Sequence, residues 1–264
     1  MSKQDSFLKR TFPTKLSVVY FILRVSVIGV LVLQLLNRNF SNVFLCVLTL
    51  VLFTLPSFVE KRLKINVPDT LEIIILLFIY AAEILGEIRE FYLTFPYWDA
   101  MLHTLNGFLC AAIGLSFVNI LNDDPKLPFQ LSPFFVVLVG FCFSMTIGVL
   151  WEFFEYGMDV FTLSDMQKDT ILHQISSVML HPEGRNVAVT VPIESIVVNN
   201  KIWNGYIDIG LIDTMQDMLV NFIGAAVFSV IGYIYLKGKS RSGITDHLLL
   251  TKIEAEDRKR EDAE

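Results

Sequence analysis

The sequence predicts an all-α integral membrane helix bundle of about six transmembrane helices, with a small outer cap that contains a β-hairpin. The chain of 264 residues is 53% hydrophobic and only 18% charged, whereas soluble domains carry about 25% charged residues. The apolar residues gather in six runs, each close to the roughly 20 residues that a membrane-spanning helix needs. A soluble fold would leave too little polar surface to cover six such runs.

The six predicted spans are residues 16–36, 40–59, 69–91, 99–121, 131–156 and 213–236. Basic residues precede the first run, as in a signal peptide. No small-residue cleavage site follows that run, however, and Arg24 interrupts it. We therefore interpret the first run as a span that is retained in the mature protein.

The basic residues between the runs predict the orientation. With both termini in the cytoplasm, 15 of the 21 Lys and Arg residues fall on the cytoplasmic side, as the positive-inside rule requires. We expect a multi-pass plasma-membrane protein in which the tail is charged and solvated. Its predicted parts are a cytoplasmic N-terminus (1–15), transmembrane helices 1–5 (16–156), an extracellular cap loop (157–212), transmembrane helix 6 (213–236) and a cytoplasmic tail (237–264).

The cap loop is the one long connection, and its hydrophobic pattern changes along its length. In the first half, from 159 to 181, Ile171, Ile175 and Met179 recur at helical spacing and predict an amphipathic helix. In the second half, Val and Ile alternate, and either Asn199-Asn200 or Asn204-Gly205 would form the turn. This alternation predicts a hairpin, and we expect residues 185–210 to cover the outer helix ends.

Pairs of polar residues recur three or four positions apart at the ends of three spans, so that each pair shares one helical face. The alternating chain direction brings all of them to the outer side of the membrane, in a single layer. Ionisable groups at membrane depth are costly and usually face the bundle interior or a wet cavity. The pairs are Asp99 with His103, Glu152 with Glu155, and Asp213 with Asp217.

Three interpretations of this layer remain open. Asp, Glu and His side chains together suit a divalent metal such as Mn, Zn, Fe or Mg. Alternatively, mutual repulsion keeps some of the carboxylates protonated. Asp99 and Asp213 could also be ordinary helix N-caps, but Glu152 and Glu155 lie at a helix C-terminus, where the helix dipole disfavours negative charge.

Other classes of function find no support in the sequence. The net charge of −6 argues against a nucleic-acid partner, because phosphate binding needs a basic face. The three cysteines lie inside apolar runs and form no metal-binding motif, so we interpret them as packing residues. The sequence contains no phosphate-binding loop, no HExxH metalloprotease motif and no nucleophile elbow.

Three segments that carry the polar pairs resemble the motifs of the YjdF-like multi-spanning membrane proteins: 98–103 (WDAMLH), 151–156 (WEFFEY) and 213–218 (DTMQDM). In the third segment this chain has Met215-Gln216 where the family often has Gln-Trp. The long segment 185–210 is more similar to Gram-positive relatives than to bacterial inner-membrane members. The function of that family is unknown, so the resemblance implies the fold and the importance of the six polar residues and supplies no reaction.

The sequence therefore leaves three classes of function open and does not decide whether the protein is an enzyme. The first is a metal-dependent enzyme that acts on a lipid or lipid-linked substrate. The second is an ion- or proton-coupled transporter, although carriers usually bind near the membrane midplane and this cluster lies at one end. The third is a non-catalytic scaffold or sensor. The lipid bilayer is the expected partner, and the sequence indicates neither the substrate nor the oligomeric state.

Overall fold

The computed structural model describes residues 15–122, 130–238, 245 and 247–252. The predicted N-terminal segment, apart from Lys15, and residues 253–264 of the predicted tail lie outside these ranges. The chain divides into two compact units, Met1–Met145 with Asn221–Glu264, and Thr146–Val220. Two long helices, α8 (Pro133–Thr162) and α9 (Leu211–Leu236), contribute residues to both units.

Within the described residues, five helices are long and apolar enough to cross a membrane. They are α2 (Lys15–Leu36), the Phe40–Leu63 stretch, α7 (Trp98–Asn122), α8 and α9. The Phe40–Leu63 stretch consists of α3 (Phe40–Leu52) and α4 (Leu55–Leu63). The remaining predicted span is built differently, because α5 (Asp69–Tyr80) continues into a π-helix, η1 (Ala81–Ile88). Neither part alone has the length to cross, so six spans stay a prediction.

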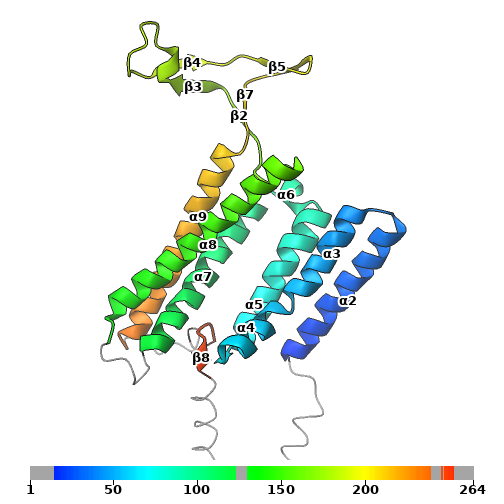
Figure 1. The fold of residues 1–264 in the computed structure, drawn as a ribbon, viewed down its shortest axis with the longest axis vertical. Coiled ribbons are helices and arrows are strands. Elements are labelled where there is room, and N and C mark those ends of the chain that lie inside the picture. Colours follow the sequence, from blue (N-terminus) through cyan, green and yellow to red (C-terminus); the bar gives the residue numbers. More distant parts are fainter. Residues whose placement is uncertain (1–14, 123–129, 239–244, 246, 253–264) are drawn as a thin grey trace, which may run out of the picture. The chain divides into compact units, whose positions relative to one another are not determined.

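The first unit contains two hydrophobic cores. One lies among α2, α3, α5 and η1 and includes Val27, Cys46, Phe53 and Leu76, which are all fully buried. Figure 1 draws α2 and α3 side by side. A short helix, α6 (Phe91–Thr94), separates η1 from α7. Burial of Cys46 agrees with its interpretation as a packing residue, and the cysteines in the described ranges are free thiols.

The second core joins α7 to the parts of α8 and α9 that belong to the first unit. Glycines allow the backbones to come close there, as is common between membrane helices. An added Cβ at Gly107 would collide with the backbone oxygen of Asn221, and one at Gly224 would collide with that of Thr104. Gly140 of α8 packs in the same way against the backbone of Leu115.

The chain after α9 returns to this second core. Strand β8 (Thr251–Lys252) pairs antiparallel with β1 (Ile65–Asn66). Residues 248–250, three consecutive leucines, are buried in the core, and the backbone N–H of Leu250 donates to the hydroxyl of Ser116 at 3.0 Å. The expectation of a solvated tail is therefore wrong for these residues, because their leucines and their backbone amide find partners in the bundle.

The second unit carries short strands between α8 and α9, which we call the β arm (170–208). Its pairs are β2 (Thr170–Leu172) with β7 (Tyr206–Asp208), β3 (Gln174–Ser177) with β4 (Val189–Pro192), and β5 (Ile196–Val198) with β6 (Lys201–Trp203). A 3-10 turn, η2 (Val178–Leu180), follows β3. The amphipathic helix expected for the first half of the loop is therefore wrong: α8 ends at Thr162, and β2 and β3 follow.

The predicted hairpin is confirmed. Asn199 and Asn200 join β5 to β6 with φ angles of 48° and 62°, so both residues are left-handed. Two left-handed central residues define the type I′ turn that matches the twist of a hairpin, and Asn tolerates this conformation. Gly205, in the second predicted turn, has a φ of 117°. A position of the arm over the outer helix ends stays a prediction.

Candidate functional site

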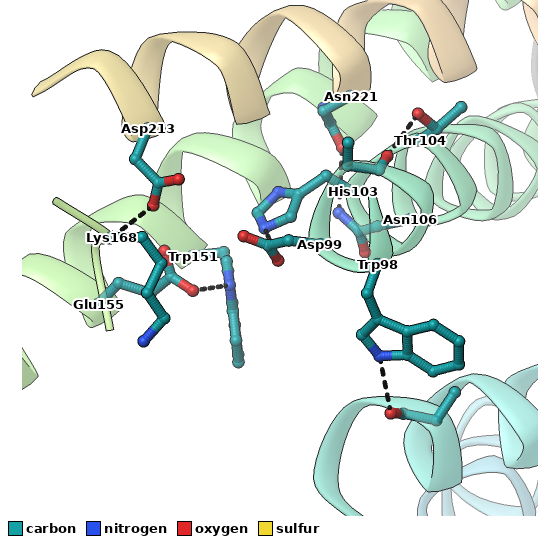
Figure 2. A network of polar contacts seen from close by, with 12 residues as sticks. Trp98, Asp99, His103, Thr104, Asn106, Trp151, Glu155, Lys168, Asp213 and Asn221 are labelled. Atoms are coloured by element: carbon teal, nitrogen blue, oxygen red, sulfur yellow. Dashed lines mark hydrogen bonds and ion pairs between the residues drawn. The ribbon is translucent and has the colours of Figure 1, made fainter. Parts of the chain in front are cut away.

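The first polar pair lies in the first two turns of α7. Asp99 and His103 are four residues apart, so a regular helix places them on one face. The Nε2 atom of His103 lies 3.5 Å from the Oδ1 atom of Asp99 (Figure 2). The imidazole is buried, whereas 29% of the Asp99 side chain is exposed. A carboxylate in this position orients an imidazole ring and raises its basicity as a ligand.

The start of α7 is fixed by the residue before this pair. The indole N–H of Trp98 donates to the backbone oxygen of Ala81, the first residue of the π-helix η1, at 3.3 Å (Figure 2). Short π-helical segments often mark functional sites. Here the bond ties the first turn of α7, and with it Asp99, to η1.

One turn deeper than His103, side-chain hydrogen bonds join α7 to its two neighbours within the first unit. The amide of Asn106 donates to the Oδ1 atom of Asn221 on α9 at 3.1 Å. The hydroxyl of Ser144 on α8 donates to the backbone oxygen of Gly107 at 2.8 Å. Asn221 and Ser144 are fully buried, so these bonds are shielded from water and fix the three helices against one another.

The second polar pair lies on α8, in the second unit. Glu152 and Glu155 are only 4% and 7% exposed. One carboxylate oxygen of each lies within 4.8 Å of the other. The indole N–H of Trp151 donates to the Oε1 atom of Glu155 at 2.8 Å and holds that carboxylate in place (Figure 2). Trp151 directly precedes Glu152 but is not among the predicted site residues.

The two residues of the third pair, Asp213 and Asp217, differ in burial and in their contacts. Asp217 is 4% exposed, whereas Asp213 is half-buried and its Oδ2 atom accepts the backbone N–H of Lys168 at 2.7 Å (Figure 2). α9 begins at Leu211, so Asp213 lies inside its first turn. In that turn the N–H of Ile212 donates to the Oδ2 atom of Asp208 at 2.8 Å. The alternative in which Asp213 serves as an N-cap is therefore wrong.

Residues 163–168, which we call the strap, follow α8 and lead to β2, and their hydrogen bonds reach the start of α9. Both oxygens of Asp159 accept backbone N–H groups from the strap, those of Met166 at 2.6 Å and Gln167 at 2.9 Å. The Gln167 side chain donates to the hydroxyl of Thr214 on α9. By bonding to the strap, Asp159 helps to hold the backbone of Lys168 next to Asp213. No sequence pattern indicates this role for Asp159.

The charged groups of three basic residues in this unit contact other parts of the β arm and the strap. The Lys168 ammonium donates to the backbone oxygen of Asp165, Lys201 lies over the ring of Trp203, and Arg185 pairs with Glu183 at 2.6 Å.

The structure places the six predicted residues on three helices and brings two of the pairs together within their own units: Asp99 with His103, and Glu152 with Glu155. Four of the six are buried: His103, Glu152, Glu155 and Asp217. Burying ionisable groups in apolar helices costs free energy, so such groups usually serve a function.

Comparison with known proteins gives a family and no function. No curated protein and no solved structure matches the chain. A family model described as "Predicted membrane protein (DUF2238)" matches residues 18–238, which include all six polar residues and the β arm. The chain therefore belongs to this family of predicted membrane proteins.

Proposed function

We propose that this membrane protein binds a divalent cation and uses it on a lipid or lipid-linked substrate at the outer face of the plasma membrane, with both termini in the cytoplasm. The proposed ligands are Asp99, His103, Glu152, Glu155, Asp213 and Asp217. The observation that carries the proposal is the buried pair on α8, whose carboxylate oxygens lie within 4.8 Å of each other. Two unit charges at that separation repel by about 3.5 kcal/mol at an effective dielectric of 20, and a cation would offset this repulsion.

Contacts inside the first unit support a common site for α7 and α9. Asn106 bonds to Asn221, and Leu115 packs on Gly232. Residue numbers therefore rise together along the contact, and the two helices run in the same direction. His103 precedes Gly107 by one turn, and Asp217 precedes Asn221 by one turn. We propose that Asp217 joins His103 at the metal site.

The contacts of α8 support its inclusion in the site. Gly140 packs on Leu115, and Ser144 bonds to Gly107. Residue numbers on α8 therefore rise while those on α7 fall, and the helices are antiparallel. Glu152 follows Ser144 by about two turns of α8, and we propose that it joins Asp99 and His103 at the metal site.

The carboxylate and imidazole groups of the proposed ligands suit a transition metal or magnesium, which favours metal binding over a purely structural role of these residues. Carboxylates suit Mg and Mn, and an imidazole adds affinity for Zn or Fe. A bound divalent ion would polarise a phosphoryl or ester oxygen of the substrate and generate a hydroxide nucleophile near neutral pH. The Asp99 carboxylate would orient the His103 ring, and Trp151 would orient Glu155.

Metal content and thermal unfolding of the purified protein test the proposal. We expect Mn, Zn, Fe or Mg to raise the melting temperature of the wild type. At a metal concentration of 100 times the Kd, binding adds about 2.7 kcal/mol to the free energy of unfolding. Asp217→Asn removes a ligand charge with little change of shape and should lower both metal content and the shift. Glu194→Gln, an exposed acid in the β arm, is the matched control and should behave as the wild type does.

Two results would redirect the proposal. If no metal shifts the melting temperature and Asp217→Asn leaves the metal content unchanged, a protonated cluster replaces the metal site. If the metal binds but crosses the membrane of reconstituted liposomes, and Asp217→Asn stops this flux, the protein is a carrier and not an enzyme.

A further inference from the structure

The apolar surface of α8 continues past its buried glutamates to the end of the helix. Phe153 and Tyr156 are 66% and 60% exposed beside Glu152 and Glu155, and two more apolar side chains follow after another turn. The start of α9 offers a matching pair. We call these four residues the collar: Phe161 (86% exposed), Leu163 (89%), Ile209 (81%) and Leu211 (64%).

Three acidic residues of the same segments accept hydrogen bonds from the backbone. Asp159 accepts the N–H groups of Met166 and Gln167, and Asp213 accepts that of Lys168. Asp208 is buried, and its carboxylate accepts the N–H of Ile212. These three carboxylates therefore bond to the backbone of the strap and of the first turn of α9, whereas Asp165 and Asp169 are exposed.

This arrangement is what a segment in contact with lipid requires. Irregular backbone survives at membrane depth only when its polar groups are bonded internally. In the strap, three consecutive N–H groups, those of residues 166–168, are bonded by carboxylates. Because such bonds to charged acceptors are stronger than neutral ones, they suit a loop at the boundary between lipid and water.

We propose that the collar lies within the lipid layer, and that the membrane surface crosses the chain at the strap, where Asp165 and the neighbouring Asp169 are exposed. The occupant of the exposed apolar surface is the bilayer itself, because the collar continues the side of α8 on which Phe153 and Tyr156 already face outward. Phe161 lies six residues beyond Glu155, about 9 Å along the helix. The buried glutamates therefore lie below the membrane surface and not at its edge.

Tryptophan fluorescence in lipid vesicles tests this inference without any metal, so its outcome is independent of the proposed function. Phe161→Trp and Leu163→Trp each add one emitter to the collar. Met179→Trp and Val187→Trp add one to exposed positions of the β arm and serve as matched controls. All variants retain the native tryptophans, so the added signal is the difference from the wild type.

In vesicles of phosphatidylcholine with brominated acyl chains, the fluorescence added at 161 and 163 should be mostly lost. The fluorescence added at 179 and 187 should be retained. Equal quenching at the two sets, or retention at all four positions, would overturn the inference. Where a tryptophan variant does not fold, a nitroxide label on a cysteine at 209, compared with one at 187, gives the same comparison through its accessibility to oxygen and to a water-soluble nickel complex.

Discussion

At the scale of single residues, Trp151 has a definite role toward Glu155. Its indole N–H donates to the carboxylate at 2.8 Å, and a hydrogen bond to a charged partner contributes more than a neutral one. We predict that Trp151→Phe lowers the free energy of unfolding by about 1–2 kcal/mol, measured by thermal unfolding in detergent. Trp203→Phe is the control, because it keeps an aromatic ring for Lys201. Equal losses in both variants would contradict the role of the indole.

Asp169 lies between the strap and β2, outside the spanning helices, and makes stability depend on pH. Burial, followed by the carboxylates of Asp165, Asp208 and Asp159, raises its pKa above the ordinary value of 3.8. The folded state therefore keeps this proton to a higher pH than the unfolded state does, and the stability that it contributes is lost as pH rises through the raised value.

We predict that Asp169→Asn melts at a higher temperature than the wild type at neutral pH. The difference should shrink as pH falls to 3.8 and below, where the wild-type carboxyl is protonated in both states. Melting curves of the two proteins across this pH range measure the effect. A difference that is the same at every pH would show that repulsion among these carboxylates is not its cause.

At the scale of helices, the crossing of α7 and α9 depends on two glycines. Added Cβ atoms at Gly107 and Gly224 would collide with the facing backbone. We predict that Gly224→Ala lowers the free energy of unfolding by about 1–3 kcal/mol, because the helices must separate. Gly29→Ala on α2, where an added Cβ meets nothing within 4 Å, is the matched control. A tolerated Gly224→Ala would mean that the helices do not pack this closely.

The helices could be predicted from the sequence better than the loop could. Runs of about 20 apolar residues have few alternatives to a helix, whereas the residues after α8 are ambiguous. Ile171, Ile175 and Met179 are spaced by four, an even number that also keeps side chains on one face of a strand. Ile171 pairs with Ile207 and Ile175 with Val191. These long-range partners decide in favour of strands, and no local pattern contains them.

In the candidate site too, the features set within one helix could be predicted from the sequence, whereas those set by the loops could not. The spacing of Asp99 and His103 predicts a pair on one helical face, and the structure confirms it at 3.5 Å. Asp208, which lies at the end of β7, accepts the N–H of Ile212 in the first turn of α9. Asp159 bonds to residues that follow it in the strap. Both depend on a loop conformation that the composition does not specify.

At the scale of the whole molecule, the proposed orientation has a direct test. Asn200 lies at an exposed hairpin turn, and His247 is an exposed residue after α9. In a Cys142→Ala background, we predict that a cysteine at 200 reacts with an impermeant maleimide added to intact cells. A cysteine at 247 should react only after the cells are opened. Reaction of position 247 from outside would reverse the orientation.

The return of residues 248–252 to the core has a consequence for biosynthesis. These residues leave the ribosome after every helix described above, yet Leu250 bonds to Ser116, 134 residues earlier in the chain, and β8 completes a pair with β1. The helices therefore enter the membrane before their shared core is complete. The last step of maturation is then the docking of residues 248–252, on the side of the membrane where α9 ends. A bulky fusion partner placed directly after Lys252 would interfere with this docking step before any other.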